Sequence, residues 1–361
     1  MKKTVLILIV LLLALTASCR ATSKSPEIPQ NLHPGDKAQV NLLNNFVETK
    51  DGCYYLNTSD PLDHFICFSP RGSTVFYPLC NKPNCAHHDE NCNAYSPFAF
   101  GYYDGFLYGI TIDHDKGGKF ELVRMNLDGS DHTVLAPLPA WNGASFLFHH
   151  GKLYIYCLGN IPNGEFERFL VMDLDTYESK ELFTDFFQAG NHLDAINFVG
   201  NKIYAAAQNM ASPQPNPHIV ELDIPSNTVR DLVSTEAPSF YASETTLYYV
   251  EPGVGFREYD LTTGEIKDCA PAVEDAWWAT YDEDYIYVMS RGRNNDADHT
   301  LYFYSRDYQL LDQVELTNNL FYGYVSSDKL YFSVGLDPLT YYIDKSDIGS
   351  HNLSLKALDK N

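Results

Sequence analysis

The chain has 361 residues, with 47 Asp and Glu against 25 Lys and Arg, and its formal net charge at pH 7 is −22. This excess of carboxylates argues against nucleic acid as a partner, because binding phosphates requires clustered Lys and Arg. The 26 Tyr and 21 Phe residues are typical of a protein rich in strands and in exposed recognition surface.

Residues 1–18 have the pattern of a secretory signal peptide. Met1-Lys2-Lys3 is basic, Val5 to Leu15 is an apolar run too short to span a bilayer, and Thr16-Ala17-Ser18 provides small residues. The small residues before Cys19 resemble the lipobox of bacterial lipoproteins. This resemblance implies that Cys19 becomes the N-terminus and carries lipid such as palmitate. The alternative is an ordinary cleaved signal followed by an incidental cysteine.

Residues 19–38 are predicted to be a tether. Ala21 to Gly35 is rich in Ser, Pro and Asn and contains few apolar residues, which is typical of a disordered linker. With lipid on Cys19, this tether would hold the rest of the chain at the cell membrane, outside the cytoplasm. The lipid would then be the only attachment to the membrane.

One short phrase recurs through the rest of the chain. It ends in Leu-Tyr or Ile-Tyr, its tyrosines are separated by 39 to 50 residues, and a looser copy begins at Asp51. The tyrosines of the clear copies are Tyr108, Tyr154, Tyr204, Tyr248, Tyr287 and Tyr331. A period of about 40–50 residues made only of strand-like segments is typical of a β-propeller. We predict that residues 39–361 form one all-β domain, a β-propeller of seven four-stranded blades, with six or eight blades as the alternatives.

One repeat illustrates the expected blade. Strands are predicted over Phe146–Gly151, Lys152–Cys157, Arg168–Asp173 and Lys180–Phe183, with a loop between the second and third and turns elsewhere. In a propeller, the second-to-third connections emerge on the same face as the connections between blades. The second-to-third connections vary in length and chemistry in this sequence, so that face is the predicted site of recognition.

Cysteines concentrate in and just after the first repeat. Cys53 and Cys67 lie on adjacent strands of one predicted hairpin and could form a disulfide across it. A denser cluster follows the expected fourth strand of this blade and is therefore predicted to lie on the recognition face. Its members are Cys80, Cys85, His87 and Cys92.

The cluster has three interpretations. Three Cys and one His within thirteen positions could supply a tetrahedral site, with structural zinc as the default metal. An exported protein meets oxidising surroundings, so two of the thiols could instead form a disulfide. The third interpretation is that the thiols stay reduced and have no common role.

The phrase Leu79-Cys80-Asn81-Lys82-Pro83-Asn84-Cys85-x-His87, with Cys92-Asn93-Ala94-Tyr95 and the repeating Leu-Tyr blades, carries a family resemblance. Nearly the whole chain after the signal resembles the propeller lipoproteins exported by Gram-positive gut-type bacteria, which are similar to TolB-type and low-density-lipoprotein-receptor-type propellers. The resemblance implies an exported lipoprotein with a propeller domain, but it supplies neither a reaction nor a ligand. The Tyr-Trp-Thr-Asp phrase of the receptor propellers is absent from this chain.

Aromatic and cationic residues near the blade connections are the candidate ligand-binding residues. Aromatic rings around the recognition face could stack on sugars or on an extended peptide. The alternative is that these rings pack between neighbouring blades. The candidates are Trp141, Phe187, Trp277, Trp278 and Tyr322, together with Arg291 and Arg293.

Two functional classes fit these features. The first, which we favour, is a non-enzymatic binding or scaffolding module for an extracellular glycan, peptide or protein. The second is an extracellular carbohydrate-active enzyme, either a hydrolase or a lyase, that uses carboxylates converging at the centre of the ring. The sequence has no glycine-rich phosphate loop, serine nucleophile elbow or His-Glu-x-x-His motif.

Overall fold

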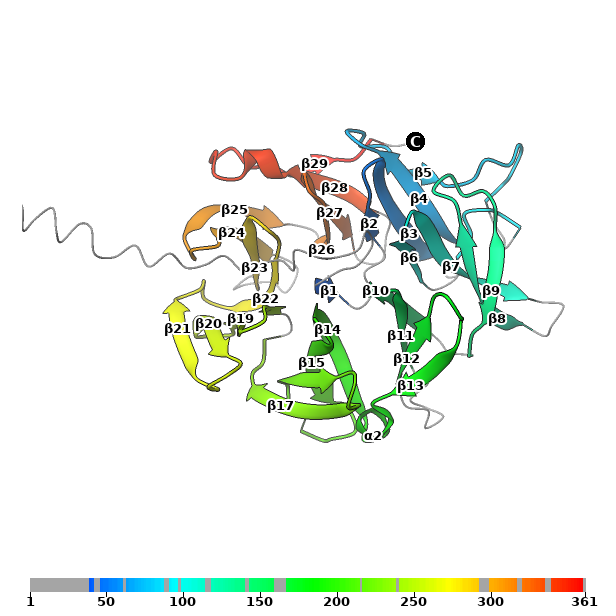
Figure 1. Ribbon diagram of the computed structural model, residues 1–361. Helices are drawn as coiled ribbons and strands as arrows, with labels where there is room; N and C mark the ends of the chain where they lie inside the picture. Colours follow the sequence, from blue (N-terminus) through cyan, green and yellow to red (C-terminus); the bar gives the residue numbers. More distant parts are fainter. Residues whose placement is uncertain are drawn as a thin grey trace, which may run out of the picture.

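Seven four-stranded antiparallel sheets follow one another along the chain and form a ring in the computed structural model (Figure 1). The four strands of each blade are consecutive in sequence, and one additional strand, β1 (Gln39–Asn41), joins the sheet of the fourth blade. The predicted seven-bladed all-β propeller is therefore confirmed. Among the residues described below, no helix is long and apolar enough to cross a membrane.

The structure describes residues 39–41, 46–60, 63–87, 91–96, 99–113, 118–139, 143–158, 167–214, 216–237, 240–291, 299–316, 320–334 and 339–359. The predicted signal peptide, Cys19 and the tether lie outside these residues.

The strands of the first four blades are β2 (Phe46–Glu48), β3 (Gly52–Asp60), β4 (Asp63–Pro70) and β5 (Tyr77–Pro78); β6 (Phe100–Tyr103), β7 (Phe106–Asp113), β8 (Lys119–Met125) and β9 (Thr133–Pro137); β10 (Gly143–His149), β11 (Lys152–Leu158), β12 (Arg168–Asp173) and β13 (Ser179–Leu182); and β14 (Asn191–Val199), β15 (Lys202–Asn209), β16 (His218–Asp223) and β17 (Thr228–Ser234). The short helix α2 (Thr184–Gln188) connects the third blade to the fourth. All four strands predicted for the third blade are confirmed to within three residues at each end.

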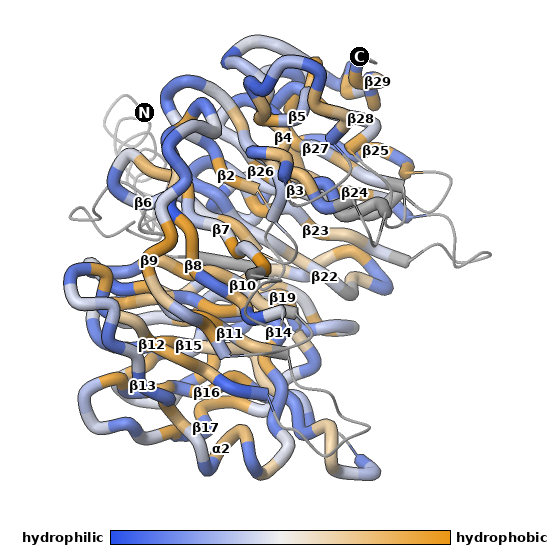
Figure 2. Tube along the Cα trace, turned by 90° about the vertical axis from the view of Figure 1, so that its right-hand side faces the viewer, coloured by the Kyte–Doolittle hydropathy of each residue, from blue (hydrophilic) through white to orange (hydrophobic). Residues whose placement is uncertain are grey.

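The strands of the last three blades are β18 (Phe240–Ala242), β19 (Thr246–Glu251), β20 (Gly255–Asp260) and β21 (Ile266–Ala270); β22 (Ala276–Tyr281), β23 (Tyr285–Arg291), β24 (His299–Ser305) and β25 (Leu310–Leu316); and β26 (Leu320–Val325), β27 (Lys329–Val334), β28 (Leu339–Asp344) and β29 (Lys356–Ala357). A 3₁₀-helix, η2 (Lys345–Asp347), follows β28. Figure 2 shows hydrophobic residues along the strands and hydrophilic residues at most of the turns.

The recurring phrase explains how the blades pack. Its Leu and Tyr are adjacent on the second strand of a blade, so their side chains point to opposite faces of the sheet. Leu153 lies in one core cluster with Tyr108 of the preceding blade, whereas Tyr154 lies in the next cluster with Ile203 of the following blade. Leu153 and Ile203 are fully buried. Each phrase therefore supplies one side chain to each of the two neighbouring interfaces.

The ring closes between blades 7 and 1. Neither of these two sheets combines strands from the beginning and the end of the described chain, because each contains only its own four consecutive strands. Tyr331 of blade 7 contributes the tyrosine of this interface, and Cys53 of blade 1 occupies the position that Leu or Ile holds elsewhere. The ring of Phe46 stacks on that of Tyr324, with centroids 5.2 Å apart. Side-chain packing between the first and last blades therefore holds the ring closed.

The two faces of the ring differ in their connections. The turn face carries the first-to-second strand connections, which are two or three residues long in every blade: residues 49–51, 104–105, 150–151, 200–201, 243–245, 282–284 and 326–328. It also carries the third-to-fourth connections, which range from four to eleven residues: 71–76, 126–132, 174–178, 224–227, 261–265, 306–309 and 345–355. The loop face carries the second-to-third connections, which range from two to nine residues: 61–62, 114–118, 159–167, 210–217, 252–254, 292–298 and 335–338. The connections between successive blades also lie on the loop face.

Candidate metal centre

The cysteine cluster lies inside the outer strand of blade 1. β5 pairs with only part of β4, and its pairing ends where the Leu79 N–H donates to the Ile66 carbonyl at 2.8 Å. The chain then leaves the sheet and returns, and the Ile66 N–H donates to the Ala94 carbonyl at 2.7 Å. Tyr95 continues the antiparallel pairing opposite Phe65. Residues 80–93 are thus an excursion from a strand that resumes at Ala94.

The cluster follows β5, the fourth strand of blade 1, as predicted, but it leaves the outer edge of the sheet partway along β4 and not at the recognition face. β4 has backbone groups beyond the reach of β5, and they need hydrogen-bond partners in a folded sheet. Residues 94–96 supply those partners, so the excursion must close on itself at its base. The sequence alone does not show which later segment pairs with β4.

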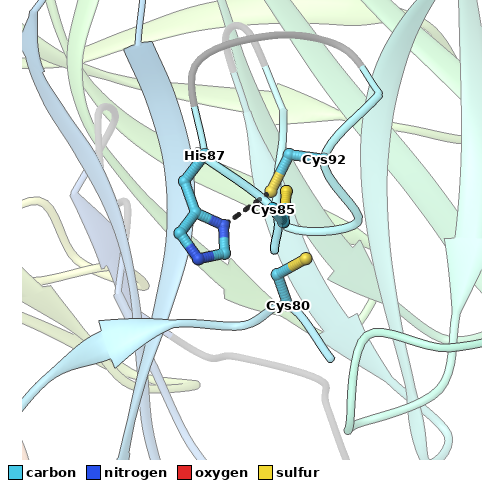
Figure 3. A group of neighbouring side chains, drawn as sticks. All are labelled: Cys80, Cys85, His87 and Cys92. Carbon is cyan, nitrogen blue, oxygen red and sulfur yellow. Dashed lines mark hydrogen bonds between the residues drawn. The ribbon is translucent and has the colours of Figure 1, made fainter. Parts of the chain in front are cut away.

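The four predicted ligands converge (Figure 3). One ligand atom from each of Cys80, Cys85, His87 and Cys92 lies within 4.8 Å of the corresponding atoms of the other three. His87 Nδ1 is 3.2 Å from the sulfur of Cys92. In a tetrahedral zinc site with metal–ligand bonds of about 2.0–2.3 Å, the ligands lie about 3.3–3.8 Å apart. The observed spacing therefore needs a contraction of about 1 Å around a metal.

The local backbone brings the ligands together. Asn84 and His87 both adopt left-handed conformations, with φ of 60° and 57°. Asn tolerates this region, and the two reversals fold the chain so that Cys85 and His87 face Cys92. The Ala94 N–H donates to the sulfur of Cys92 at 3.4 Å, as expected around a thiolate.

The thiols have different acidities. Burial raises the pKa of Cys92 to about 12. Burial also acts to raise the pKa of Cys80, but backbone N–H groups of Lys82 and Asn93 and the neighbouring thiols outweigh it and lower this pKa. Cys80 is therefore more acidic than an ordinary thiol and Cys92 less so, and a bound cation would favour ionisation of all three because metal ligands are deprotonated thiols.

The donor set can bind a metal. Three sulfurs and one imidazole nitrogen form a closed site of the kind that holds structural zinc, with no open position for a substrate. Every cysteine in the part of the chain that the structure describes is a free thiol, so no disulfide holds the excursion there. The close approach of all four groups also disfavours the interpretation that the thiols have no common role.

The cluster adjoins the interface between blades 1 and 2. Cys92 is buried in the same core cluster as Tyr54 of blade 1 and Leu107 of blade 2, and Cys80 and Cys85 pack against that cluster. The turn before β9 also touches the base of the excursion: a Cβ on Gly129 would lie 2.5 Å from the Leu79 carbonyl oxygen. An ordered excursion therefore supports the contact between these two blades.

Cys53 and Cys67 do not form the predicted hairpin disulfide in this structure, because both thiols are free. In the register of β3 and β4, Cys53 lies opposite Ser69 and Cys67 lies opposite Tyr55, so the two cysteines are diagonal neighbours. Diagonal positions are about 7–8 Å apart, which is beyond the usual Cα separation for a disulfide. Burial raises the pKa of each thiol to about 12.

The candidate ligand-binding residues fall in different environments. Phe187, in α2, is 1% exposed and packs in the core between blades 3 and 4, as the alternative interpretation expects. Trp278 is partly buried against the core between blades 6 and 7. The backbones of Trp277, Arg291 and Tyr322 lie in β22, β23 and β26, but their side chains are outside the description, as are Trp141 and Arg293 entirely.

A polar cluster that sequence reasoning missed lies between blades 3 and 4, at the loop-face ends of their strands. Nδ1 of His192 is 2.6 Å from Oε1 of Glu167, and its Nε2 is 3.2 Å from Oδ1 of Asp194. The Tyr156 hydroxyl donates to Oε2 of Glu167 and accepts from the Leu193 N–H at 3.0 Å. Both imidazole nitrogens are engaged, so this arrangement is a clamp between blades and leaves no base free for a substrate.

The clamp predicts a specific pH dependence. Hydrogen bonds from His192 to Asp194 and Glu167 raise the pKa of the imidazole to about 10, from an ordinary value of 6.5. The charged form stabilises the fold fully below pH about 6.5, and this contribution is lost as pH rises through about 10. His192→Gln is therefore expected to lower the free energy of unfolding by about 1.5–3 kcal/mol at pH 6, and by progressively less as pH approaches 10.

Urea unfolding of the parent and the variant between pH 6 and pH 10 measures this difference. His150→Gln, at an exposed position in the turn between β10 and β11 of the neighbouring blade 3, is the control and should change stability by less than about 0.5 kcal/mol. An effect of His192→Gln that grows with pH would contradict the assignment.

No protein-family model matches the chain, and no curated protein has a matching sequence. Among solved structures, the chain is similar to the β-propeller domain of the Trilobed protease from Pyrococcus furiosus, with a TM-score of 0.48, 12% identity, and coverage of 90% of this chain and 98% of that one. It is also similar to an acylaminoacyl peptidase in complex with Z-Gly-Gly-Phe-chloromethyl ketone, with a TM-score of 0.50 and 13% identity over 88% of this chain. The match spans about half of the peptidase, 52% of its length. At this identity, the likeness concerns the fold.

Proposed function

We propose that this chain is a binding module, held outside the cytoplasm at the cell membrane by lipid on Cys19, that recognises a glycan or an extended peptide or protein segment on its loop face. The observation that carries the proposal is that the second-to-third connections on the loop face differ in length from two to nine residues, whereas the first-to-second connections at the opposite ends of the same inner strands are all two or three residues long. Variable connections on a rigid ring are where propellers place recognition. The propeller resemblance is compatible with this role but does not identify a ligand.

A glycan and peptide array probed with the soluble chain from Gln30 onward tests the proposal. For any ligand found, replacing residues 210–214 of the loop face with Gly and Ser should lower the affinity at least about tenfold, or 1.4 kcal/mol. The matched replacement of Ser243-Glu244-Thr245 on the turn face should leave the affinity unchanged. Equal loss from both replacements would contradict loop-face binding.

The lipid anchor gives a separate prediction. With Cys19 acylated, the protein should partition into membranes and detergent phase, because two acyl chains bind a bilayer stably whereas one does so only marginally. Cys19→Ala should release it into the aqueous phase. Mass spectrometry of the mature N-terminus and phase partitioning measure this outcome. Unchanged partitioning of Cys19→Ala would contradict the anchor.

We also propose that Cys80, Cys85, His87 and Cys92 hold a structural zinc ion. The convergence of their four ligand atoms supports this assignment. Zinc would supply binding energy that adds to the packing of Cys80, Cys85 and Cys92 on the core between blades 1 and 2 and orders the excursion. Within the module, this metal would keep the outer strand of blade 1 continuous rather than take part in ligand chemistry.

A further inference from the structure

The N-terminal strand β1 lies at the centre of the ring (Figure 1). It pairs with β14, the innermost strand of blade 4, through Gln39 opposite Asn197, Val40 opposite Ile196 and Asn41 opposite Ala195. The chain then begins blade 1 at Phe46. The amino-terminal part of the described chain therefore contributes a strand to blade 4 before blade 1 begins.

The direction of β1 follows from this register. β14 begins after α2 on the loop face and ends at the turn of residues 200–201 on the turn face. β1 is antiparallel to β14, and Gln39 pairs nearer the turn-face end than Asn41 does. The chain that precedes Gln39 therefore meets β1 from the turn face.

From this direction we infer that the membrane-anchored protein presents its turn face to the lipid surface and its loop face to the external medium. This inference rests on the proposed lipid anchor at Cys19. It also identifies the kind of partner that the loop face fits, namely a ligand that arrives from the external medium rather than a lipid headgroup.

The length of the tether favours the turn face, rather than the loop face, as the side near the membrane. The segment from Cys19 to Gln39 can reach about 70 Å when fully extended, and as a flexible chain its root-mean-square span is about 25 Å. The nine residues of β14 make the ring about 30 Å deep along its axis. To place the loop face on the membrane, the tether would have to run across the turn face and around four strands spaced about 4.8 Å apart. That route uses most of the extended length, so chain entropy disfavours it.

Electrostatic attraction to lipid does not favour the opposite orientation, with the loop face on the membrane. The first-to-second strand turns carry seven carboxylates and one lysine, so an anionic lipid surface repels the turn face. The carboxylates are Asp51, Asp104, Glu244, Asp282, Glu283, Asp284 and Asp328, and the lysine is Lys50. The second-to-third connections on the loop face are also acidic, so this face gains no attraction to an anionic surface either; they carry Asp115, Glu165, Glu167, Asp296, Asp298 and Asp337 against Lys116 and Arg293. The tether therefore sets the orientation, with the turn face near the membrane but not adsorbed on it.

Energy transfer to a lipid surface tests this orientation. The chain from Arg20 onward would carry a polyhistidine tag at its N-terminus in place of the lipidated cysteine, bound to vesicles that contain a nickel-chelating lipid and an acceptor dye on the headgroups. A donor dye would be attached to an azide-bearing amino acid that replaces either Glu244, in a turn-face connection, or Met210, in a loop-face connection and 53% exposed. We expect at least twofold more efficient transfer from position 244 than from position 210.

A control moves the same tag to the C-terminus, so that the chain no longer enters through the centre of the ring. The difference between the two positions should then fall below twofold. Equal transfer from both positions with the N-terminal tag, or stronger transfer from position 210, would overturn the inference. The nickel lipid replaces the native anchor, so this result is independent of the Cys19→Ala experiment, and failure of the lipid anchor can be told apart from failure of the orientation.

Discussion

Cys85→Ser is expected to abolish zinc binding and to melt the outer strand of blade 1. Serine is a poor substitute for a thiolate ligand, and the remaining two sulfurs and one nitrogen cannot complete a tetrahedral site. Purified parent protein should contain about one zinc per chain and the variant close to none.

The variant should lose more stability in the outer strand of blade 1 than in the propeller as a whole. Structural zinc contributes about 10–16 kcal/mol of binding free energy in small zinc domains, but residues 80–93 lie at an outer edge and can open without unfolding the ring. We expect the global free energy of unfolding to fall by only about 3 kcal/mol. Hydrogen exchange should rise most at the backbone N–H groups of Ile66 and Ser96, which pair β4 with residues 94–96.

Metal analysis, hydrogen exchange and urea unfolding of protein purified under reducing conditions measure these effects. Cys269→Ser is the matched control, because Cys269 lies in β21 of blade 5, away from the cluster, and should bind no metal. Parent protein without stoichiometric metal, or normal zinc content in Cys85→Ser, would contradict the proposed site.

Phe46→Ala is expected to destabilise the whole propeller by about 3–5 kcal/mol. Phe46 is 3% exposed and stacks on Tyr324 across the only blade interface that joins the two ends of the described ring. Its removal leaves a cavity that Tyr331 and Tyr324 cannot fill without breaking their own packing. Because no strand is shared between blades 1 and 7, closure there depends on this packing together with the hydrogen bond from the Ser327 N–H to the Glu48 carboxylate.

Urea unfolding followed by far-ultraviolet circular dichroism measures the change. Val134→Ala in β9 is the control, since Val134 is 53% exposed and its truncation should cost less than about 0.5 kcal/mol. A loss below about 1 kcal/mol for Phe46→Ala would show that closure depends on other contacts.

The predicted blades agree with the structure because their signals are local. Each repeat contains its own alternation of buried and exposed residues, its turns, and the Leu-Tyr pair that points to two faces of one strand. The structure adds that Leu153 and Tyr154 of one such pair pack in two different blade interfaces. The spacing of Cys80, Cys85, His87 and Cys92 likewise indicated a common site, because short loops limit how far these residues can separate.

The repeat period favoured seven blades over six or eight, and local patterns predicted the four consecutive strands of a blade and the grouping of Cys80, Cys85, His87 and Cys92. Only the tertiary structure decided that the outer strand of blade 1 resumes at Ala94, that β1 pairs with β14, that Cys53 packs with Tyr331, and that His192 joins Glu167. These contacts join segments whose separation has no sequence period. They form because folding leaves particular backbone edges, apolar faces and buried charges that require partners, and those requirements exist only once the ring has closed.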